Sequence, residues 1–398
     1  MKFRKTTSRL PFWSAWKFPC RLFLKLKCKV KSINEERGGA LKRIITFLSV
    51  VIFLLAGCTE KEETVTDTTD EKLPVVAESE EVIKKLSSDL AGFHFVADWL
   101  TNTEVLFVEK DESAYFLKTF HINTGEVTVL YEDTSIIVDV LVHPLKDKIL
   151  IHTSDSSESG IVKVLSHTGF IEHEVTIESS ELEIEWNDME PSLILFTAFY
   201  EDWTYDVFLF DGIENDLQLF PLDNPFPKWL GSEKIVTSNF DNHSNVPADL
   251  NLYDRAGEPQ ITGQENVIYF DTYQKSLLLI QMNDEDEATY SLLNQDLSTL
   301  STWKVSVALN DAAWVFPEID WLPNEQLILA RDDHQDESEQ VYELVGVTDD
   351  EQVILADNIP EGPVRCSPDG EKCLIGYAFE HLIDLKNHDK IDWLIFTE

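Results

Sequence analysis

The stretch "WLTNTEVLF" (Trp99–Phe107) occurs in closely similar form at two later points of the chain, as "WLGSEKIVT" (Trp229–Thr237) and "WLPNEQLIL" (Trp321–Leu329). Each copy is a Trp-Leu pair, a four-residue polar turn and an apolar run that begins six residues after the tryptophan. A unit that returns along a chain is the signature of a repeat architecture, in which each copy packs against its neighbours.

Weaker copies lie between these three. They begin at residues that we call anchors, together with the tryptophans: His143, Trp186, Phe270 and Cys366. The seven anchors are 44, 43, 43, 41, 51 and 45 residues apart, and about 40–45 residues is the length of one four-stranded propeller blade. We therefore expect an all-β chain whose residues 91–398 form a β-propeller, with seven blades by the anchor count and six as the alternative.

The segments between anchors have room for further strands. Their runs are rich in β-branched and aromatic residues, and Gly, Pro, Asn and Asp separate them, as strands and turns require. We expect only one short helix, over "SEEVIKKLSSDL" (Ser79–Leu90), where the domain begins. The tryptophans Trp99, Trp186, Trp229 and Trp321 are either ligand platforms or packing between blades; the repeated position favours packing.

The turn "SPDG" (Ser367–Gly370) resembles the turn that recurs in propellers of the TolB and prolyl-oligopeptidase type. Pro368 presets φ, and Gly370 accepts the positive φ that such a turn needs. Cys366 and Cys373 flank this turn on two strands that we expect to pair. They either form a disulfide, as an even pair in an exported protein suggests, or remain two small buried thiols.

An apolar run, Ile44–Leu55, follows Lys42 and Arg43 and has the layout of an export signal. It is shorter than the roughly 20 residues that span a bilayer. Its end, Leu55-Ala56-Gly57-Cys58, resembles the bacterial lipobox. The resemblance implies cleavage before Cys58 and a diacylglycerol on its sulfur. Two or more acyl chains anchor a protein stably in a membrane, whereas one holds it only marginally. The alternative is a buried helix that ends in a chance cysteine.

Four regions follow from this reading. Residues 1–40 are a basic leader, either a real cytoplasmic extension or a wrongly assigned start, and the second interpretation is favoured. Residues 41–57 are the signal peptide, and residues 58–85 form a disordered acidic tether, because "TEKEETVTDTTDEK" lacks the apolar residues that folding requires. The propeller follows.

The chain has 32 basic and 73 acidic residues, a net charge of −41. The segment before Cys58 contains 13 of the basic residues and 2 of the acidic residues. The rest of the chain therefore has 19 basic and 71 acidic residues, a net charge of −52. Such a field repels nucleic acid, so no nucleic-acid partner is expected. It serves solubility in a saline or alkaline habitat or attracts a cationic ligand, and the first cause is favoured.

Lipobox, acidic tether and degenerate propeller together resemble the YqgU-like lipoproteins of Gram-positive bacteria, over residues 42–398. The resemblance implies a propeller of uncharacterised function, lipid-anchored on the extracytoplasmic face of the cell membrane. It also implies six blades, whereas the anchors number seven.

No catalytic motif stands out: there is no G-x-S-x-G, H-E-x-x-H, paired C-x-x-C or phosphate loop. The acidic loops around His334 and at Asn283–Tyr290 are interpreted as solvated hairpin tips rather than cation sites. We expect no metal and no cofactor. The favoured hypothesis is a non-catalytic binding or scaffold module for an envelope protein, a peptide or a cell-wall fragment. Alternatives are a hydrolase or lyase with its site in the propeller channel, and a purely structural envelope protein.

Overall fold

In the computed structural model, the described residues are 82–220, 222–239, 246–282, 288–305, 308–310, 313–332, 341–348 and 351–397. The segments 1–40, 41–57 and almost all of 58–85 lie outside them, as do Cys58 and His334. Among the described residues no helix is long and apolar enough to cross a membrane.

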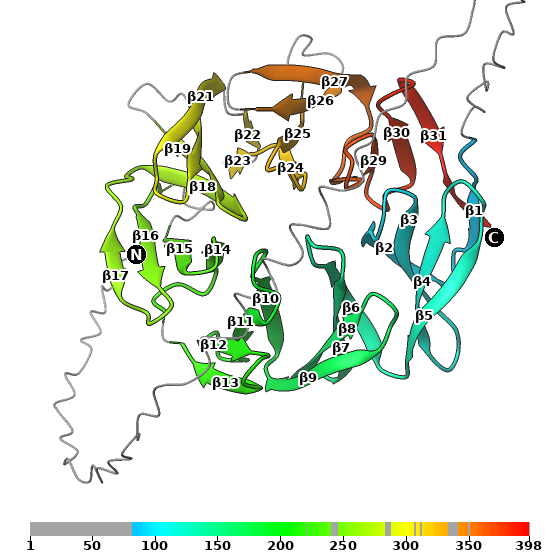
Figure 1. Cartoon of the computed structure of the whole chain (residues 1–398), viewed down its shortest axis with the longest axis horizontal. Coiled ribbons are helices and arrows are strands. Elements are labelled where there is room, and N and C mark those ends of the chain that lie inside the picture. Colours follow the sequence, from blue (N-terminus) through cyan, green and yellow to red (C-terminus); the bar gives the residue numbers. More distant parts are fainter. Residues whose placement is uncertain are drawn as a thin grey trace, which may run out of the picture. The chain divides into compact units, whose positions relative to one another are not determined.

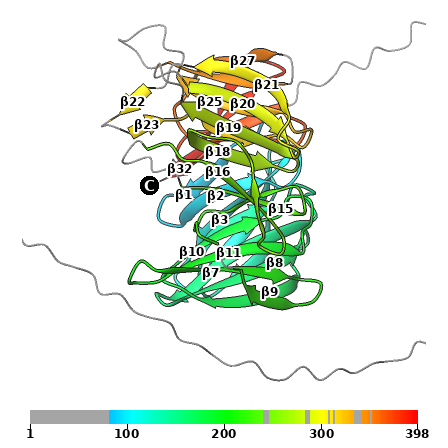
Figure 2. The same ribbon diagram turned by 90° about the vertical axis from the view of Figure 1, so that its left-hand side faces the viewer.

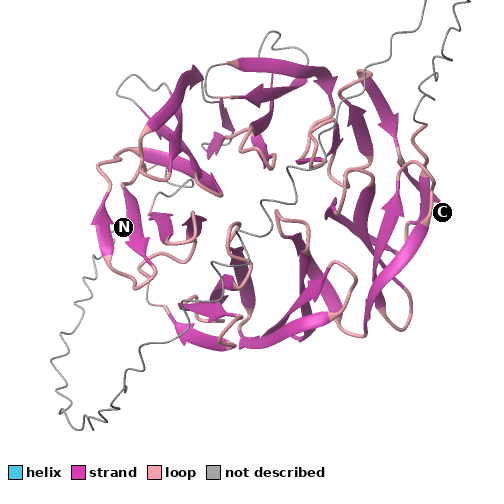
Figure 3. Cartoon of the chain, viewed as in Figure 1, coloured by secondary structure: helices cyan, strands magenta, loops and turns pink. Residues whose placement is uncertain are grey.

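Seven four-stranded antiparallel sheets stand around a common axis as the blades of a propeller (Figures 1 and 3). The seven-blade expectation is thereby confirmed. In every blade the strands pair in chain order, from the innermost strand at the axis to the outermost strand at the rim. This order arises because each strand is joined to the next by a short turn, which makes antiparallel pairing of neighbours the closest contact available.

The strands of the first three blades are as follows. Blade 1 comprises β2 (Phe93–Trp99), β3 (Glu104–Lys110), β4 (Tyr115–His121) and β5 (Val127–Asp133). Blade 2 comprises β6 (Ile136–Val142), β7 (Lys148–Ser156), β8 (Ser159–Ser166) and β9 (Ile171–Glu178). Blade 3 comprises β10 (Glu181–Trp186), β11 (Leu193–Phe199), β12 (Tyr205–Asp211) and β13 (Asp216–Leu219).

The other four blades complete the ring. Blade 4 comprises β14 (Lys228–Leu230), β15 (Lys234–Ser238), β16 (Leu250–Asp254) and β17 (Pro259–Ile261). Blade 5 comprises β18 (Val267–Tyr273), β19 (Ser276–Met282), β20 (Ala288–Asn294) and β21 (Thr299–Val305). Blade 6 comprises β24 (Glu318–Trp321), β25 (Leu327–Asp332), β26 (Tyr342–Val347) and β27 (Gln352–Ile359). Blade 7 comprises β28 (Val364–Cys366), β29 (Lys372–Ile375), β30 (His381–Asp384) and β31 (Asp389–Asp392). A separate hairpin, β22 (Ala308–Asn310) with β23 (Ala313–Val315), stands beside the blades (Figure 2).

The hydrophobic core is divided among the seams between blades. Seven clusters of buried apolar residues lie in the described residues, one at each seam. The second strand of a blade packs on both neighbours, so β3, β7 and β11 each contain a continuous run of buried residues. Outer strands such as β13 are fully exposed. A strand covered on both faces needs a continuous apolar run, which is the pattern that follows each anchor in the sequence.

The ring closes through a pair of strands outside the blades. β1 (Leu86–Asp89) runs parallel to β32 (Leu394–Thr397), with Leu86 opposite Leu394. The expectation of a helix over Ser79–Leu90 is wrong for these residues. Leu86 and Ser88 are buried and their neighbours Ser87 and Asp89 are exposed, so the alternation of a strand edge decides this segment. Ile83, just before it, is also buried.

Candidate functional site

A cavity of about 340 Å³ lies on the axis, at the mouth where the innermost strands end. All seven blades contribute to its lining, from Asp98 in blade 1 to Arg365 in blade 7. Successive side chains of a strand point to opposite sides. The anchor at the end of an innermost strand therefore turns into a seam, and the residue before it turns toward the axis.

Charged side chains of both signs line much of this channel mouth. We call them the charge ring; in blade order they are Asp98, Lys146, Glu185, Lys228, Asp271, Asp320 and Arg365. Five of them directly precede an anchor in the sequence. The charged position before the anchor is visible in the sequence, but the sequence predicts no site there because these residues meet only when the ring closes.

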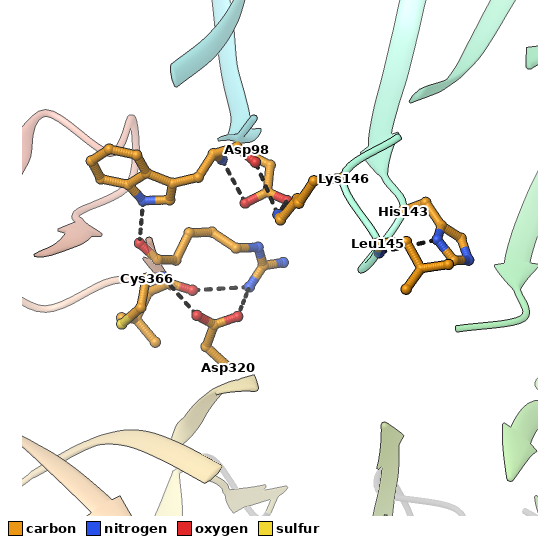
Figure 4. Close-up of polar contacts among 9 residues, drawn as sticks. Asp98, His143, Leu145, Lys146, Asp320 and Cys366 are labelled. Atoms are coloured by element: carbon orange, nitrogen blue, oxygen red, sulfur yellow. Dashed lines mark hydrogen bonds and ion pairs between the residues drawn. The ribbon is translucent and has the colours of Figure 1, made fainter. Parts of the chain in front are cut away.

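Ion pairs in the charge ring join neighbouring blades. Lys228 Nζ lies 2.9 Å from Asp271 Oδ1, between blades 4 and 5. Lys146 Nζ lies 3.3 Å from Asp98 Oδ2 and donates to the Trp99 carbonyl at 2.9 Å (Figure 4). Arg365 Nη1 lies 3.9 Å from Asp320 Oδ1 (Figure 4). These pairs join adjacent blades at the axis.

Carboxylates of the ring also accept hydrogen bonds from the following blade. The Trp229 amide donates to Glu185 Oε1 at 3.1 Å, and the Cys366 amide donates to Asp320 Oδ2 at 2.7 Å. The Trp321 indole donates to Asp271 Oδ2 at 2.8 Å. In these three hydrogen bonds the donor and acceptor residues are 44, 46 and 50 residues apart, which is about the length of one repeat. The sequence repeat thus recurs as a repeated bond between blades.

This pattern corrects the anchor of blade 5. Phe270 was expected to be the anchor of that blade. The residue that receives the next blade's indole is Asp271, so Thr272 is the structural anchor and Phe270 packs in the seam between blades 4 and 5. Only two residues separate Tyr273 from Ser276, whereas four separate Trp99 from Glu104, so β18 continues further before the chain reverses.

The four anchor tryptophans pack at seams, but only two of them are also part of the cavity lining. Trp99 and Trp229 are almost wholly buried and their indoles donate to backbone carbonyls of the preceding blade, Arg365 and Glu185. Trp186 and Trp321 pack in seams and also line the cavity. Trp321 stacks on Tyr273 with ring centroids 5.9 Å apart, which adds an aromatic wall to the channel mouth.

Burial changes the proton affinity of three carboxyls at the channel mouth. It raises the pKa of Glu185 to about 7 and the pKa values of Asp188 and Asp320 to about 6. Among the described residues, Asp320 has an ion pair with Arg365, whereas Glu185 and Asp188 accept only backbone hydrogen bonds, from Trp229 and Gln274. A carboxyl removed from water favours its neutral form unless a cation compensates.

None of the histidines that the structure describes lines the cavity. His143 is fully buried, and its Nε2 lies 3.0 Å from the Asn187 carbonyl in the next blade. His94 makes the same kind of contact, with the Ile137 carbonyl at 3.0 Å. Within the described ranges no group of three His, Cys, Asp or Glu residues is arranged to hold a metal ion.

Cys366 and Cys373 lie directly opposite each other on β28 and β29 and form a disulfide, with an S–S distance of 1.98 Å. Of the two arrangements left open by the sequence, the structure contains the bond. It ties together the two strands that carry the "SPDG" turn, next to Arg365 of the charge ring.

We expect no free thiol in the chain from Thr59 to Glu398 until a reductant is added. Reduction should lower the free energy of unfolding by about 2–3 kcal/mol, the entropy expected for so short a loop. Thiol titration in denaturant, with and without reductant, measures the free thiols. Urea unfolding measures the change in the free energy of unfolding. Two free thiols in the unreduced protein would contradict the prediction.

Comparison with known proteins matches residues 121–376 to a family model described as a YqgU-like 6-bladed beta propeller domain. The match covers more than half of the chain. The chain belongs to the YqgU-like family. The matched residues contain blades 2 to 6 entire and only parts of blades 1 and 7; the blade count of this member is seven.

Two relatives of this YqgU-like chain are uncharacterised. The uncharacterised lipoprotein YqgU of Bacillus subtilis (strain 168) is 23% identical over 86% of this chain and 94% of its own length. A crystal structure of an uncharacterised protein of Listeria monocytogenes EGD-e has a TM-score of 0.71 at 17% identity, over 79% of this chain and 98% of that one.

An enzyme also has this fold. An oligogalacturonate lyase of Vibrio parahaemolyticus has a TM-score of 0.50 at 9% identity, over 74% of this chain and 87% of that one. At such identity the likeness concerns the fold alone.

Proposed function

We propose that this YqgU-like protein is a non-catalytic binding module, held by lipid on Cys58 at the extracytoplasmic face of the membrane, whose ligand occupies the channel mouth. The observation that carries this proposal is the cavity on the propeller axis. Its volume of about 340 Å³ suits a small molecule or the end of a peptide. The ligand is a small envelope metabolite, a peptide end or a cell-wall fragment.

The lining favours a ligand with polar groups of more than one kind. Lys146, Lys228 and Arg365 offer donors. Glu185 and Asp188, which form no ion pair in the described residues, offer acceptors, and Trp321 with Tyr273 offers an aromatic wall. Apolar walls with a few converging polar groups are typical of small-molecule sites.

The test is thermal unfolding of the chain from Cys58 to Glu398, bearing Cys58→Ala, in the presence of amino acids, amines, sugars and muropeptides. A ligand at 100 times its Kd adds about 2.7 kcal/mol, which raises Tm by several degrees. We expect one class to do so, with the rise lost in Glu185→Gln and retained in Glu181→Gln, an exposed residue of the same strand. An equal rise in both variants would place the ligand elsewhere.

Anchoring is tested by crosslinking in intact cells with recovery of attached partners. One dominant envelope partner, lost when Cys58→Ala releases the protein, supports a tethered module. Absence of a protein partner under several crosslinking chemistries removes the protein-scaffold version and leaves the small-ligand version.

A second function, hydrolase or lyase, is favoured by one observation. Glu185, in the cavity, has a pKa raised to about 7, and a carboxyl that retains its proton near neutral pH can act as a general acid. If the protein is an enzyme, a bound ligand should be turned over, and Glu185→Gln should lower the turnover rate at least 100-fold. A binding module predicts that the ligand is recovered unchanged.

A further inference from the structure

Trp203 is exposed to solvent over 86% of its surface, although tryptophan is among the most apolar side chains. It lies in the turn that joins β11 to β12 in blade 3. The Trp203 amide donates to the Tyr200 carbonyl at 2.9 Å, and Asp202 Oδ1 accepts from the Thr204 amide at 3.1 Å. The turn is therefore well formed without any contribution from the indole.

The backbone of Trp203 has φ of +64°, in the left-handed region. Glycine adopts this conformation freely, whereas a side chain with a Cβ is strained in it. A glycine would serve the turn better, and the exposed indole gains nothing from burial. Folding therefore gives no reason for tryptophan at this position.

Further aromatic side chains lie at the two strand ends that this turn joins and in the loop that follows blade 3. Phe226, in the loop between blades 3 and 4, is 57% exposed, and its ring lies 5.7 Å from that of Phe199 at the end of β11. The Phe199 ring lies 6.1 Å from that of Tyr205. We call these residues, with Trp203, the Trp203 patch. It is at the end of the blade away from the channel mouth, because β11 begins beside the anchor Trp186 and ends at Phe199.

The segment of the chain that carries the Trp203 patch has carboxylates and no base. No Lys or Arg occurs between Lys163 and Lys228. Blade 3 contains eleven carboxylates: Glu181, Glu183, Glu185, Asp188, Glu190, Glu201, Asp202, Asp206, Asp211, Glu214 and Asp216. Glu201, Asp202 and Asp223 are exposed in the same two loops as Trp203 and Phe226. The other six blades each contain at least one base.

We propose that the Trp203 patch docks a segment of a partner protein in which Lys or Arg flanks an apolar side chain. The apolar side chain would pack on the exposed rings, and the cations would meet the surrounding carboxylates or lie over the indole face. Nucleic acid and anionic lipid carry the wrong charge for this surface. The site is independent of the channel mouth, so both can be occupied at once.

The first test measures binding of two labelled peptides to the chain from Cys58 to Glu398 with Cys58→Ala: one alternating Lys with Leu, the other alternating Glu with Leu. We expect the Lys peptide to bind and the Glu peptide not to. Trp203→Gly, which suits the turn, should weaken binding at least tenfold. Phe170→Ala, which removes a 75% exposed ring from blade 2, should change it less than twofold. Equal affinity in Trp203→Gly and wild type would overturn the proposal.

Two further arms address other occupants. Binding to phosphatidylglycerol vesicles that is lost in Trp203→Gly would mean a lipid surface instead and would overturn the proposal. In cells, a photo-crosslinking residue at position 203 of the full chain identifies the contacted segment. A Lys- or Arg-containing segment supports the proposal, and a neutral or acidic segment contradicts it. None of these readouts depends on a ligand in the channel mouth.

Discussion

Trp393→Ala is expected to lower the free energy of unfolding by about 3–5 kcal/mol, the usual cost of deleting a buried tryptophan side chain. Trp393 lies between blade 7 and β32 and is fully buried. Its ring stacks on Phe120 of blade 1 at 5.5 Å, and its indole donates to the Phe379 carbonyl of blade 7 at 2.7 Å. It therefore joins the first and last blades.

The loss should exceed that at other seams, because the Trp393 carbonyl also accepts from the Leu86 amide at 2.7 Å and so begins the β1–β32 pair. A propeller is stable only as a closed ring, since an open seam exposes two apolar faces. Urea unfolding measures the effect. Ile395→Ala in β32, at a side chain already 37% exposed, is the matched control and should cost less than about 1 kcal/mol. Similar losses in both variants would show that the tail contributes little to closure.

Glu185→Gln is expected to gain stability relative to wild type as the pH rises. The folded pKa of Glu185 is raised from 4.5 to about 7, so the fold favours the neutral acid. The stability that this proton contributes is fully present below pH 4.5 and is lost as the pH rises through about 7. For one such group the change is about 3 kcal/mol, and glutamine, which stays neutral, avoids it.

The comparison is between variants, because other groups titrate in the opposite sense. Burial lowers the pKa of His143 and of His152, so their contribution is present above pH 6.5 and lost as the pH falls. Subtracting the wild-type curve removes them. Urea unfolding at pH 5 and pH 8 is the measurement, and Glu181→Gln should give a difference near zero at both. A pH-independent difference for Glu185→Gln would mean that Glu185 is charged throughout.

Much of the fold could be predicted because every blade of a propeller repeats the same short sequence pattern. Trp99, Trp229 and Trp321, followed by a turn and an apolar run, specify a strand, its reversal and its buried partner within a dozen residues. The anchor of blade 5 was not predicted correctly, because the turn after β18 is two residues shorter than the turn after Trp99 and the anchor is Thr272 instead of Phe270. The strand at Leu86–Asp89 was not predicted either, because its partner is more than 300 residues away.

The sequence by itself determined the repeat, the blade count and the acidity of blade 3, because these depend on residue order and composition. Only the tertiary structure decided what the charged residues before the anchors do. Asp98, Glu185, Lys228, Asp320 and Arg365 are about one repeat or more apart along the chain and become neighbours only when the ring closes. Burial at that mouth then raises the pKa of Glu185, and the same closure places Trp203 on a separate surface with no base in its blade.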